Sequence, residues 1–276
     1  MTRIEVINCE DDPRVEVFRD VRDRDLRGRD GIFMAESEMV VRRLLRTPAA
    51  VHSLLLCPER RARMRDVLDG LPPEIPIYEA PIELMESIAG FHIHRGVLAA
   101  GRRPLESHVV IDRLFDCLPT EGNGRVLAAS GINNVDNMGG LFRTAAALSV
   151  CGVLLGDRCC DPLYRKAIRV SMGHVLSVPW AVHDPLIEGL QEFRSRGWTL
   201  VAAETGVDAL PVAQWNPPPR MVLVVGAEGS GLTQDVLDLC DQRIEIPMAK
   251  GVPSLNVVVA AGILLAHGPI GSINPR

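Results

Sequence analysis

Short hydrophobic runs alternate with amphipathic segments along the first hundred residues. The runs VHSLLLC and GVLAAG have the length and composition of buried strands, whereas ESEMVVRRLLR places its apolar residues at helical spacing. In PERRARMRDVLDG, a proline near the start and a glycine at the end delimit a further helix. The pattern predicts helices over residues 36–46, 58–70 and 81–90, and strands over 51–57, 75–80 and 96–101.

The second half of the chain repeats this alternation with more strands. Strands that alternate with helices predict an α/β fold with a mostly parallel sheet and helices on both of its faces. The predicted strands are 125–130, 152–156, 175–180, 198–203, 221–225 and 243–246. The predicted helices are 138–150, 162–170, 185–196, 233–239 and 254–266.

Turn residues concentrate between the two alternating regions, in the segment LPTEGNG at 118–124. The sequence therefore predicts a smaller α/β domain over 1–104, a linker over 105–123 and a second α/β domain over 124–276. Both domains are of ordinary size for a globular protein.

Composition narrows the classes of protein. The chain has 276 residues, of which 47% are hydrophobic and 24% charged, which excludes a disordered or collagen-like protein. Its net charge of −5 gives no general attraction to a polyanion, so any contact with nucleic acid is local. Arginine accounts for 28 of the 30 basic residues and suits bidentate binding of phosphate, although biased codon usage explains the excess at least as well.

Membrane and disulfide classes are also disfavoured. No apolar run reaches the roughly 18 to 20 residues of a membrane-spanning helix, and the charged start does not resemble a signal peptide. We therefore expect a cytoplasmic protein with no membrane partner. The seven cysteines form no C-x-x-C pair, which favours reduced thiols over disulfides or zinc ligands.

Three segments of the second half place glycine or small polar residues after a predicted strand, where open α/β sheets bind ligands. The first is GINNVDNMGGLFRTAAAL (131–148), in which Gly139 and Gly140 open a helix that carries Arg143. The structural interpretation of this segment is that Asn137 is a helix N-cap and Arg143 a surface residue. Taken alone, the segment favours that structural interpretation.

The second segment is MVLVVGAEGSGLTQDVLDLCDQRIEIPM (221–248). Its glycine pattern matches neither the dinucleotide fingerprint nor the phosphate loop. Glu228 would repel a pyrophosphate but could accept hydrogen bonds from ribose hydroxyls or fix an arginine. Glu245 lies 19 residues after Gly226, near the place of the ribose-binding acid in dinucleotide folds, so a nicotinamide-dependent oxidoreductase stays an alternative.

The third segment is GVPSLNVVVAAGILLAHG (251–268), where Pro253 and Ser254 start a helix that is apolar on every side. Such a helix is expected to be buried. Ser254 and Asn256 are the only polar side chains near its start. An ordinary serine N-cap with an adjoining asparagine explains them at least as well as a binding site does.

Together, four strings resemble the three sequence motifs of the SpoU/TrmH family of RNA ribose 2′-O-methyltransferases. They are N-x-G-x-x-x-R (137–143), V-G-A-E-G-S-G-L (225–232), I-P-M (246–248) and S-L-N-V (254–257). The resemblance covers about 124–268 with order and spacing kept, and it implies a trefoil knot in the catalytic domain. More faintly, residues 1–104 resemble the RNA-binding domain, similar to a ribosomal protein, that many members carry, with HRGVLA (94–99) as its closing strand.

The resemblance also implies the ligands and the assembly. S-adenosyl-L-methionine would bind within the knot as the methyl donor, no metal would be needed, and the protein would be a homodimer that binds RNA. The turn at 203–205 would lie near the donor. On the matching positions the cofactor-binding residues are Gly226, Ile246, Met248 and Leu255.

The same resemblance implies five catalytic residues. Arg143 would engage the target ribose or its 3′ phosphate and help to activate the hydroxyl, either as the base or only by positioning. Asn137 and Glu228 would orient that arginine and the substrate. Ser254 and Asn256 would complete the pocket over the methyl donor.

Two features qualify the picture. Val258 stands where the family motif often has a serine, for which we expect altered packing more than lost chemistry. Arg158, Arg165, Lys166 and Arg169 form the best local basic cluster for tracking phosphates, although a solvated helix face explains them equally well.

The expected activity is methyl transfer to a ribose 2′-hydroxyl of structured RNA. Ribosomal RNA is favoured over transfer RNA by analogy alone, because of the suspected N-terminal domain. The alternative is a non-catalytic RNA-binding or ribosome-assembly protein, against which the intact motif positions count.

Overall fold

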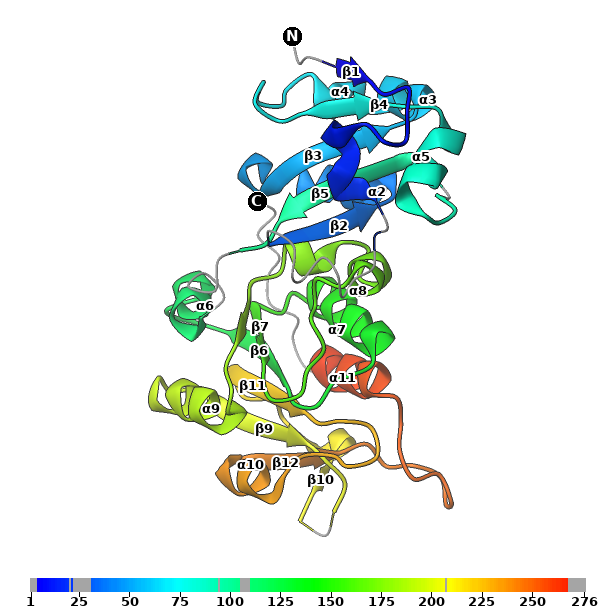
Figure 1. The fold of residues 1–276 in the computed structure, drawn as a ribbon. Coiled ribbons are helices and arrows are strands. Elements are labelled where there is room, and N and C mark those ends of the chain that lie inside the picture. Colours follow the sequence, from blue (N-terminus) through cyan, green and yellow to red (C-terminus); the bar gives the residue numbers. More distant parts are fainter. Residues whose placement is uncertain are drawn as a thin grey trace. The chain divides into compact units, whose positions relative to one another are not determined.

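The computed structural model divides the chain into two units, drawn as a ribbon in Figure 1. Unit 1 comprises residues 1–105 and 163–177, and unit 2 comprises residues 106–162 and 178–276. The described residues are 4–19, 21, 31–93, 95–104, 110–206 and 208–267. The predicted domain limits stay a prediction, but residues 163–177 group with unit 1 although the sequence suggested the second domain for them.

A five-stranded mixed sheet forms the centre of unit 1, in the order β1-β4-β3-β5-β2. β4 pairs parallel with β1 and β3, whereas β5 pairs antiparallel with β2 and β3. The hydrophobic pattern does not predict β2, because its short apolar run leads directly into the helix that follows. The strands are β1 (Ile4–Val6), β2 (Ile32–Glu36), β3 (Val51–Leu56), β4 (Ile77–Glu79) and β5 (Val97–Arg102).

Short helices cover the sheet of unit 1. The predicted helix over 58–70 is two helices, because the backbone leaves helical geometry at Met64, with φ of −100° and ψ of 10°. The helices are α2 (Glu38–Leu44), α3 (Pro58–Arg63), α4 (Arg65–Leu68), α5 (Ile82–Ala89) and α8 (Arg165–Val170). The 3₁₀ helices are η1 (Pro13–Phe18), η2 (Pro48–Ala50) and η4 (His174–Leu176).

A seven-stranded parallel sheet forms unit 2, in the order β10-β12-β9-β11-β6-β7-β8. Its central strands are buried hydrophobic runs, as expected for a parallel sheet that is covered on both faces. The strand predicted over 175–180 instead begins at Trp180. The strands are β6 (Gly124–Ala129), β7 (Gly152–Leu155), β8 (Trp180–Val182), β9 (Thr199–Ala203), β10 (Leu210–Pro211), β11 (Arg220–Val225) and β12 (Gln242–Glu245).

The helices of unit 2 differ from the prediction at two places. α6 lies in the expected linker and buries Ile111 and Leu114 in the core of the unit. α11 packs on α7 and β11, but Val259 and Ile263 are 49% and 39% exposed, so the expectation that this helix is buried on all sides is wrong. The elements are α6 (Ile111–Cys117), α7 (Val135–Ala147), α9 (Leu186–Ser195), η5 (Val212–Gln214), α10 (Gln234–Leu239) and α11 (Val257–Ala266).

The strand order determines where a site can form. β12, β9 and β11 are parallel neighbours, so their carboxyl ends bring residues 203–205, 226–232 and 246–248 to one edge of the sheet. β6 is the next strand, and its carboxyl end leads to α7. Within the described residues, every helix is too short or too polar to cross a membrane.

Candidate active site

A cavity of about 370 Å³ lies at the carboxyl ends of β9, β11 and β12. Its lining includes the four residues expected to hold the cofactor, Gly226, Ile246, Met248 and Leu255. The lining also includes two expected catalytic residues, Glu228 and Ser254, and the turn at 203–205. The structure thus brings the second and third motif segments to one cavity.

The loop after β11 contains glycines that let the backbone fold closely on itself. The N–H of Gly231 donates to the carbonyl oxygen of Ala227 at 3.0 Å and closes the loop. A Cβ atom on Gly226 would lie 2.7 Å from the backbone nitrogen of Leu232, which is closer than side chains are found. Only glycine therefore fits at position 226, and its backbone forms part of the cavity wall.

Three polar side chains, one from each motif segment, form a hydrogen-bond network. Nδ2 of Asn137 donates to Oε1 of Glu228 at 3.0 Å, and Nδ2 of Asn256 donates to the same oxygen at 2.9 Å. Nδ2 of Asn256 also donates to Oδ1 of Asn137 at 2.9 Å. The network joins the start of α7 to the loop after β11 and the start of α11, next to the cavity.

The start of α7 differs from the prediction. The N-cap is Asn134, whose Oδ1 accepts hydrogen bonds from the backbone N–H of Asp136 at 2.8 Å and from that of Asn137 at 3.3 Å. Gly139 and Gly140 lie inside the helix rather than at its start. Because Asn134 supplies the cap, the side chain of Asn137 is available to the network.

The start of α11 also differs. Asn256 is the N-cap, and its Oδ1 accepts the N–H of Val258 at 2.9 Å. Ser254 precedes the helix and is exposed at the cavity. The amide of Asn256 therefore uses its oxygen for the cap and its nitrogen for the network.

Arg143 is exposed on α7, and no residue in the described ranges forms a hydrogen bond or ion pair with its side chain. The expected orientation of Arg143 by Asn137 and Glu228 is not found within this chain, because those two groups bind each other and Asn256. An exposed guanidinium offers five donors for bidentate contact with phosphate.

Val258 packs on α7. A Cβ atom on Gly140 would lie 2.7 Å from Cγ2 of Val258, so the contact between the two helices needs glycine at 140. Val258, which stands where the family motif often has a serine, is thus a packing residue between α11 and α7, next to the polar network.

The cavity wall is acidic. Glu204, Glu228 and Glu245 line it, and its described lining contains neither lysine nor arginine. Such a wall repels a pyrophosphate and attracts a cationic ligand. This distribution of charge disfavours a dinucleotide cofactor.

The cysteines take no part in this site. All seven are free thiols. Burial raises the pKa of Cys160 to about 11 and that of Cys240 to about 12, which keeps both thiols protonated and unreactive near neutral pH. Among the described residues, no group of His, Cys, Asp or Glu side chains is arranged to hold a metal ion.

The residues of the predicted basic cluster are divided between the two units. Arg158 belongs to unit 2, whereas Arg165, Lys166 and Arg169 belong to unit 1. Nη1 of Arg165 donates to Oε2 of Glu36 at 2.9 Å, and its guanidinium lies 4.1 Å from the ring centre of Phe91. Arg165 is therefore held by unit 1 and is not available to track phosphates.

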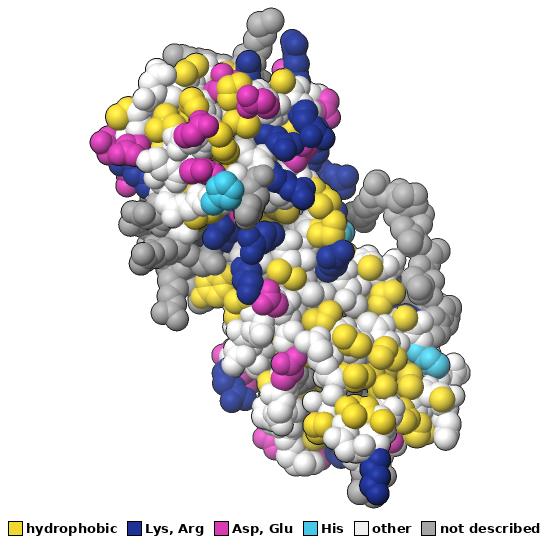
Figure 2. Space-filling view, turned by 90° about the vertical axis from the view of Figure 1, so that its right-hand side faces the viewer, with side chains coloured by type: hydrophobic (Ala, Val, Ile, Leu, Met, Phe, Trp, Pro, Cys, Tyr) yellow, Lys and Arg dark blue, Asp and Glu magenta, His cyan; other side chains and the backbone are white. Residues whose placement is uncertain are grey.

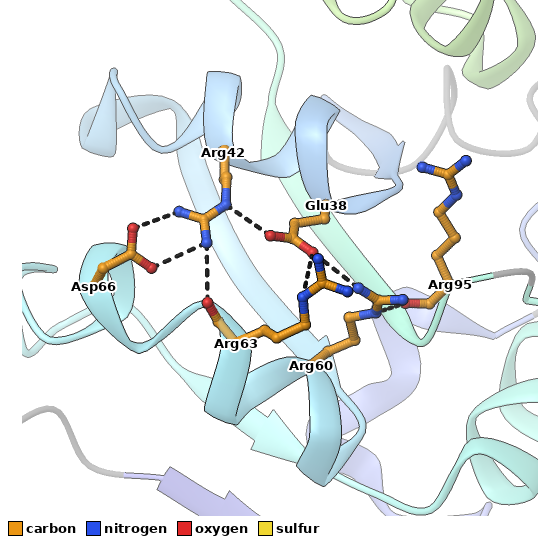
Figure 3. Close-up of polar contacts among 6 residues, drawn as sticks. All are labelled: Glu38, Arg42, Arg60, Arg63, Asp66 and Arg95. Carbon is orange, nitrogen blue, oxygen red and sulfur yellow. Dashed lines mark hydrogen bonds and ion pairs between the residues drawn. The ribbon is translucent and has the colours of Figure 1, made fainter.

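A different arginine cluster, which the sequence analysis did not single out, lies in unit 1 (Figure 3). Oε1 of Glu38 accepts a hydrogen bond from Nε of Arg42 at 3.0 Å, and Oε2 accepts one from Nη1 of Arg60 at 2.8 Å. Nη1 of Arg42 also donates to Asp66 at 2.6 Å. Although burial opposes ionisation, hydrogen bonds and charges of the arginines hold the pKa of Glu38 below its ordinary value.

The outer arginines of this cluster are less engaged. Nε of Arg63 lies 3.7 Å from Oε2 of Glu38, and the Arg63 side chain is 69% exposed. Arg95 accepts a hydrogen bond from Arg60 through its backbone oxygen at 2.7 Å, and its guanidinium points away from the cluster in Figure 3. Arg60, Arg63 and Arg95 line a cavity of about 380 Å³, whose wall also includes Glu59. We call these three residues the arginine rim.

Comparison with known proteins decides the family. The family model "SpoU rRNA Methylase family" matches residues 124–266. The chain belongs to this family. An uncharacterized tRNA/rRNA methyltransferase of Mycobacterium bovis is 38% identical over 260 residues, which cover 92% of this chain and 87% of the relative.

A 23S rRNA (guanosine-2′-O-)-methyltransferase of Ralstonia nicotianae is 31% identical over 208 residues, covering 75% of this chain and 82% of the relative. Among solved structures, an AdoMet-bound rRNA methyltransferase from Sinorhizobium meliloti has a TM-score of 0.77 at 21% identity, covering 95% of this chain and 96% of that one. This likeness confirms the expected knotted, mostly parallel α/β fold. Membership in an RNA methyltransferase family removes the nicotinamide-dependent alternative.

Proposed function

We propose that this SpoU methyltransferase transfers a methyl group from S-adenosyl-L-methionine to a ribose 2′-hydroxyl of structured RNA, with ribosomal RNA as the favoured substrate. The network of Asn137, Glu228 and Asn256 carries the proposal, because it unites the three motif segments beside the cavity. The guanosine-2′-O activity named for the Ralstonia relative supports the choice of ribose and of ribosomal RNA. We propose that the enzyme lies in the cytoplasm, together with its RNA substrate.

The cavity fits the methyl donor. Its wall combines backbone at the glycine loop with apolar side chains and carboxylates, which suit an adenosine with a cationic sulfonium. Gly226, Ile246, Met248 and Leu255 would hold the donor. When bound, the sulfonium supplies an activated methyl group, and no metal is part of the proposal.

The residues of the chain would act mainly by positioning. A ribose hydroxyl is a poor nucleophile, so holding its oxygen in line with the methyl group supplies much of the rate. Arg143, exposed and without a partner among the described residues, would bind the target ribose or its phosphate. The hydrogen bonds among Asn137, Glu228 and Asn256 would fix the pocket edge beside Ser254.

We further propose that the exposed side of α11 packs against a second copy of the chain. Figure 2 shows hydrophobic side chains gathered on one face of unit 2. Val252, Val259 and Ile263 are all at least 39% exposed on α11 or the segment before it. A helix with hydrophobic residues on every side needs cover on every side.

The arginine rim is our proposed RNA contact in unit 1. In the cluster of Figure 3, Glu38 and Asp66 form their hydrogen bonds with Arg42 and Arg60, and Arg63 is a more distant ion-pair partner of Glu38 at 3.7 Å. The 69% exposed side chain of Arg63 and the outward guanidinium of Arg95 would contact phosphate. The assignment is consistent with the role expected for residues 1–104 as an RNA-binding domain.

One experiment tests the activity. The purified protein is incubated with methyl-labelled S-adenosylmethionine and unmodified ribosomal or transfer RNA, and the RNA is then hydrolysed in alkali. A methylated 2′-oxygen cannot attack the adjoining phosphodiester, so the expected label lies in an alkali-resistant dinucleotide from ribosomal RNA. Label in mononucleotides would contradict ribose methylation, and donor binding without any transfer would favour the non-catalytic alternative.

A further inference from the structure

Glu204 lines the proposed donor cavity and also contacts the loop after β11. It follows β9, and its backbone N–H donates to the carbonyl oxygen of Ile244 in β12 at 3.1 Å. Its half-buried carboxylate turns toward the loop after β11, where Oε2 accepts the N–H of Leu232 at 3.2 Å. Oε1 accepts the N–H of Thr205 at 3.2 Å. One residue thus connects the carboxyl ends of three neighbouring strands.

The loop is shaped to receive this carboxylate. Gly231 has a φ of +63°, and a Cβ atom there would overlap Oε2 of Glu204. Behind it, a Cβ atom on Gly226 would overlap the carbonyl group of Gly231. Backbone packing thus requires glycine at 226, and a side chain at 231 would displace the carboxylate of Glu204.

The loop held in this way carries groups of the proposed site near its start and a core residue at its far end. Gly226 lines the cavity, and Glu228 accepts the amide groups of both network asparagines. At the far end, Leu232 is buried in the core of unit 2, so its N–H needs an acceptor. The carboxylate of Glu204 is that acceptor.

We propose that Glu204 is a positioning residue that latches the loop 226–232 in the conformation that binds the methyl donor. Without the carboxylate, the Leu232 N–H loses its partner and the loop loses its tie to β9. Donor affinity then falls, although the side chain of Glu204 takes no part in the methyl transfer. The inference rests on the proposed function of the cavity.

The test measures donor binding and loop protection separately. Calorimetry with S-adenosylmethionine in the absence of RNA gives Kd for the wild type and for Glu204→Ala, Glu204→Gln and Glu204→Asp. We expect Glu204→Ala to weaken binding about tenfold, the effect of losing one charge-assisted hydrogen bond. Gln keeps an oxygen acceptor at the same reach and should recover much of the affinity, whereas the shorter Asp should not.

Hydrogen exchange resolved at the Leu232 amide reports the latch itself. We expect faster exchange at Leu232 in Glu204→Ala and unchanged exchange in the strands β6 and β11. This pattern separates a local latch from general destabilisation.

A pair of glycine variants supplies a matched control. Gly229 and Gly231 both have positive φ, +89° and +63°, but a Cβ atom on Gly229 meets nothing within 4 Å. Both alanine variants therefore strain the backbone, and only Gly231→Ala collides with Glu204. We expect Gly231→Ala to weaken donor binding more than Gly229→Ala, and the loss to be smaller when Gly231→Ala is combined with Glu204→Ala.

The outcomes are distinct. Wild-type affinity and wild-type exchange at Leu232 in Glu204→Ala would overturn the latch and leave the proposed function intact. Equal losses in the two glycine variants would also count against it, since backbone strain alone would explain them. A wild-type protein that does not bind S-adenosylmethionine would instead overturn the proposed cofactor.

Discussion

The two units place opposite charges around their cavities. In unit 2, three glutamates and no basic residue line the described cavity wall. In unit 1, three arginines line a cavity of similar volume, with Glu59 as the only carboxylate among the described lining residues. A chain with a net charge of −5 can therefore still offer separate surfaces to a cationic methyl donor and to a polyanion. The difference suggests a division of labour that substitutions can test.

Arg143 should give the largest effect, because it is the exposed arginine of α7 that we assign to the substrate. We expect Arg143→Ala to lower the single-turnover rate of methyl transfer by about a hundredfold or more, with the Kd for S-adenosylmethionine unchanged. Arg143→Lys should recover little, since an ammonium lacks the bidentate fork. Full activity in Arg143→Ala would contradict the assignment.

The exposed side of α11 should determine the assembly. We expect Val259→Glu to convert a dimer to a monomer in light scattering, because a charge on this apolar face opposes association. Val182→Glu is a matched control that should stay a dimer, since Val182 on β8 is 45% exposed and Val259 is 49% exposed. A wild-type monomer would contradict the proposed interface.

The sequence predicts the buried strands of unit 2 better than it predicts the caps of its helices. The hydrophobic runs indicate β6 and β11 directly, because strands buried on both faces need no polar positions. In contrast, which residue caps a helix depends on backbone geometry that the sequence does not show. Three asparagines stand near the start of α7, and sequence spacing does not distinguish Asn134, which caps the helix, from Asn137, which binds Glu228.

Long-range pairs set the limit of sequence reasoning in both units. The pair of Glu38 and Arg42 has helical i,i+4 spacing and is readable in the sequence, but Arg60 joins it from 22 residues away. Asn137 and Asn256 are 119 residues apart, and the family resemblance alone placed them in one site. Arg143 seemed a partner of Asn137 for the same reason, yet the amide groups bind each other. Spacing does not show which polar groups satisfy one another.

Packing at Gly140 offers the third test. We expect Gly140→Ala to lower the free energy of unfolding by about 1–3 kcal/mol, because its Cβ would press on Val258. Gly70→Ala is the control, since a Cβ there meets nothing within 4 Å. Val258→Ala should reduce the cost of Gly140→Ala in a double-mutant cycle. Urea unfolding measures all three, and additive costs would contradict the contact.

The arginine rim should affect RNA and leave the donor untouched. We expect the double variant Arg63→Ala, Arg95→Ala to bind RNA about three- to tenfold more weakly. The slope of log affinity against log salt concentration should fall by an amount that corresponds to about one to two phosphate contacts. Arg65→Ala is the control, because Arg65 is 79% exposed nearby and pairs with Asp69 at 3.2 Å. Titration of labelled RNA at several salt concentrations gives both quantities. Equal losses in rim and control would show a diffuse charge effect.

The smallest effect concerns the acid beneath the rim. The pKa of Glu38 is lowered in the folded protein from its ordinary 4.5, where burial opposes and the arginines favour ionisation. The carboxylate therefore contributes stability above about pH 4.5 and loses it as pH falls through the lowered pKa. Glu38→Gln resembles the protonated acid, so its deficit in urea unfolding relative to wild type should be full at pH 7 and shrink toward pH 3. A deficit independent of pH would mean that shape, rather than charge, holds Arg42 and Arg60 in place.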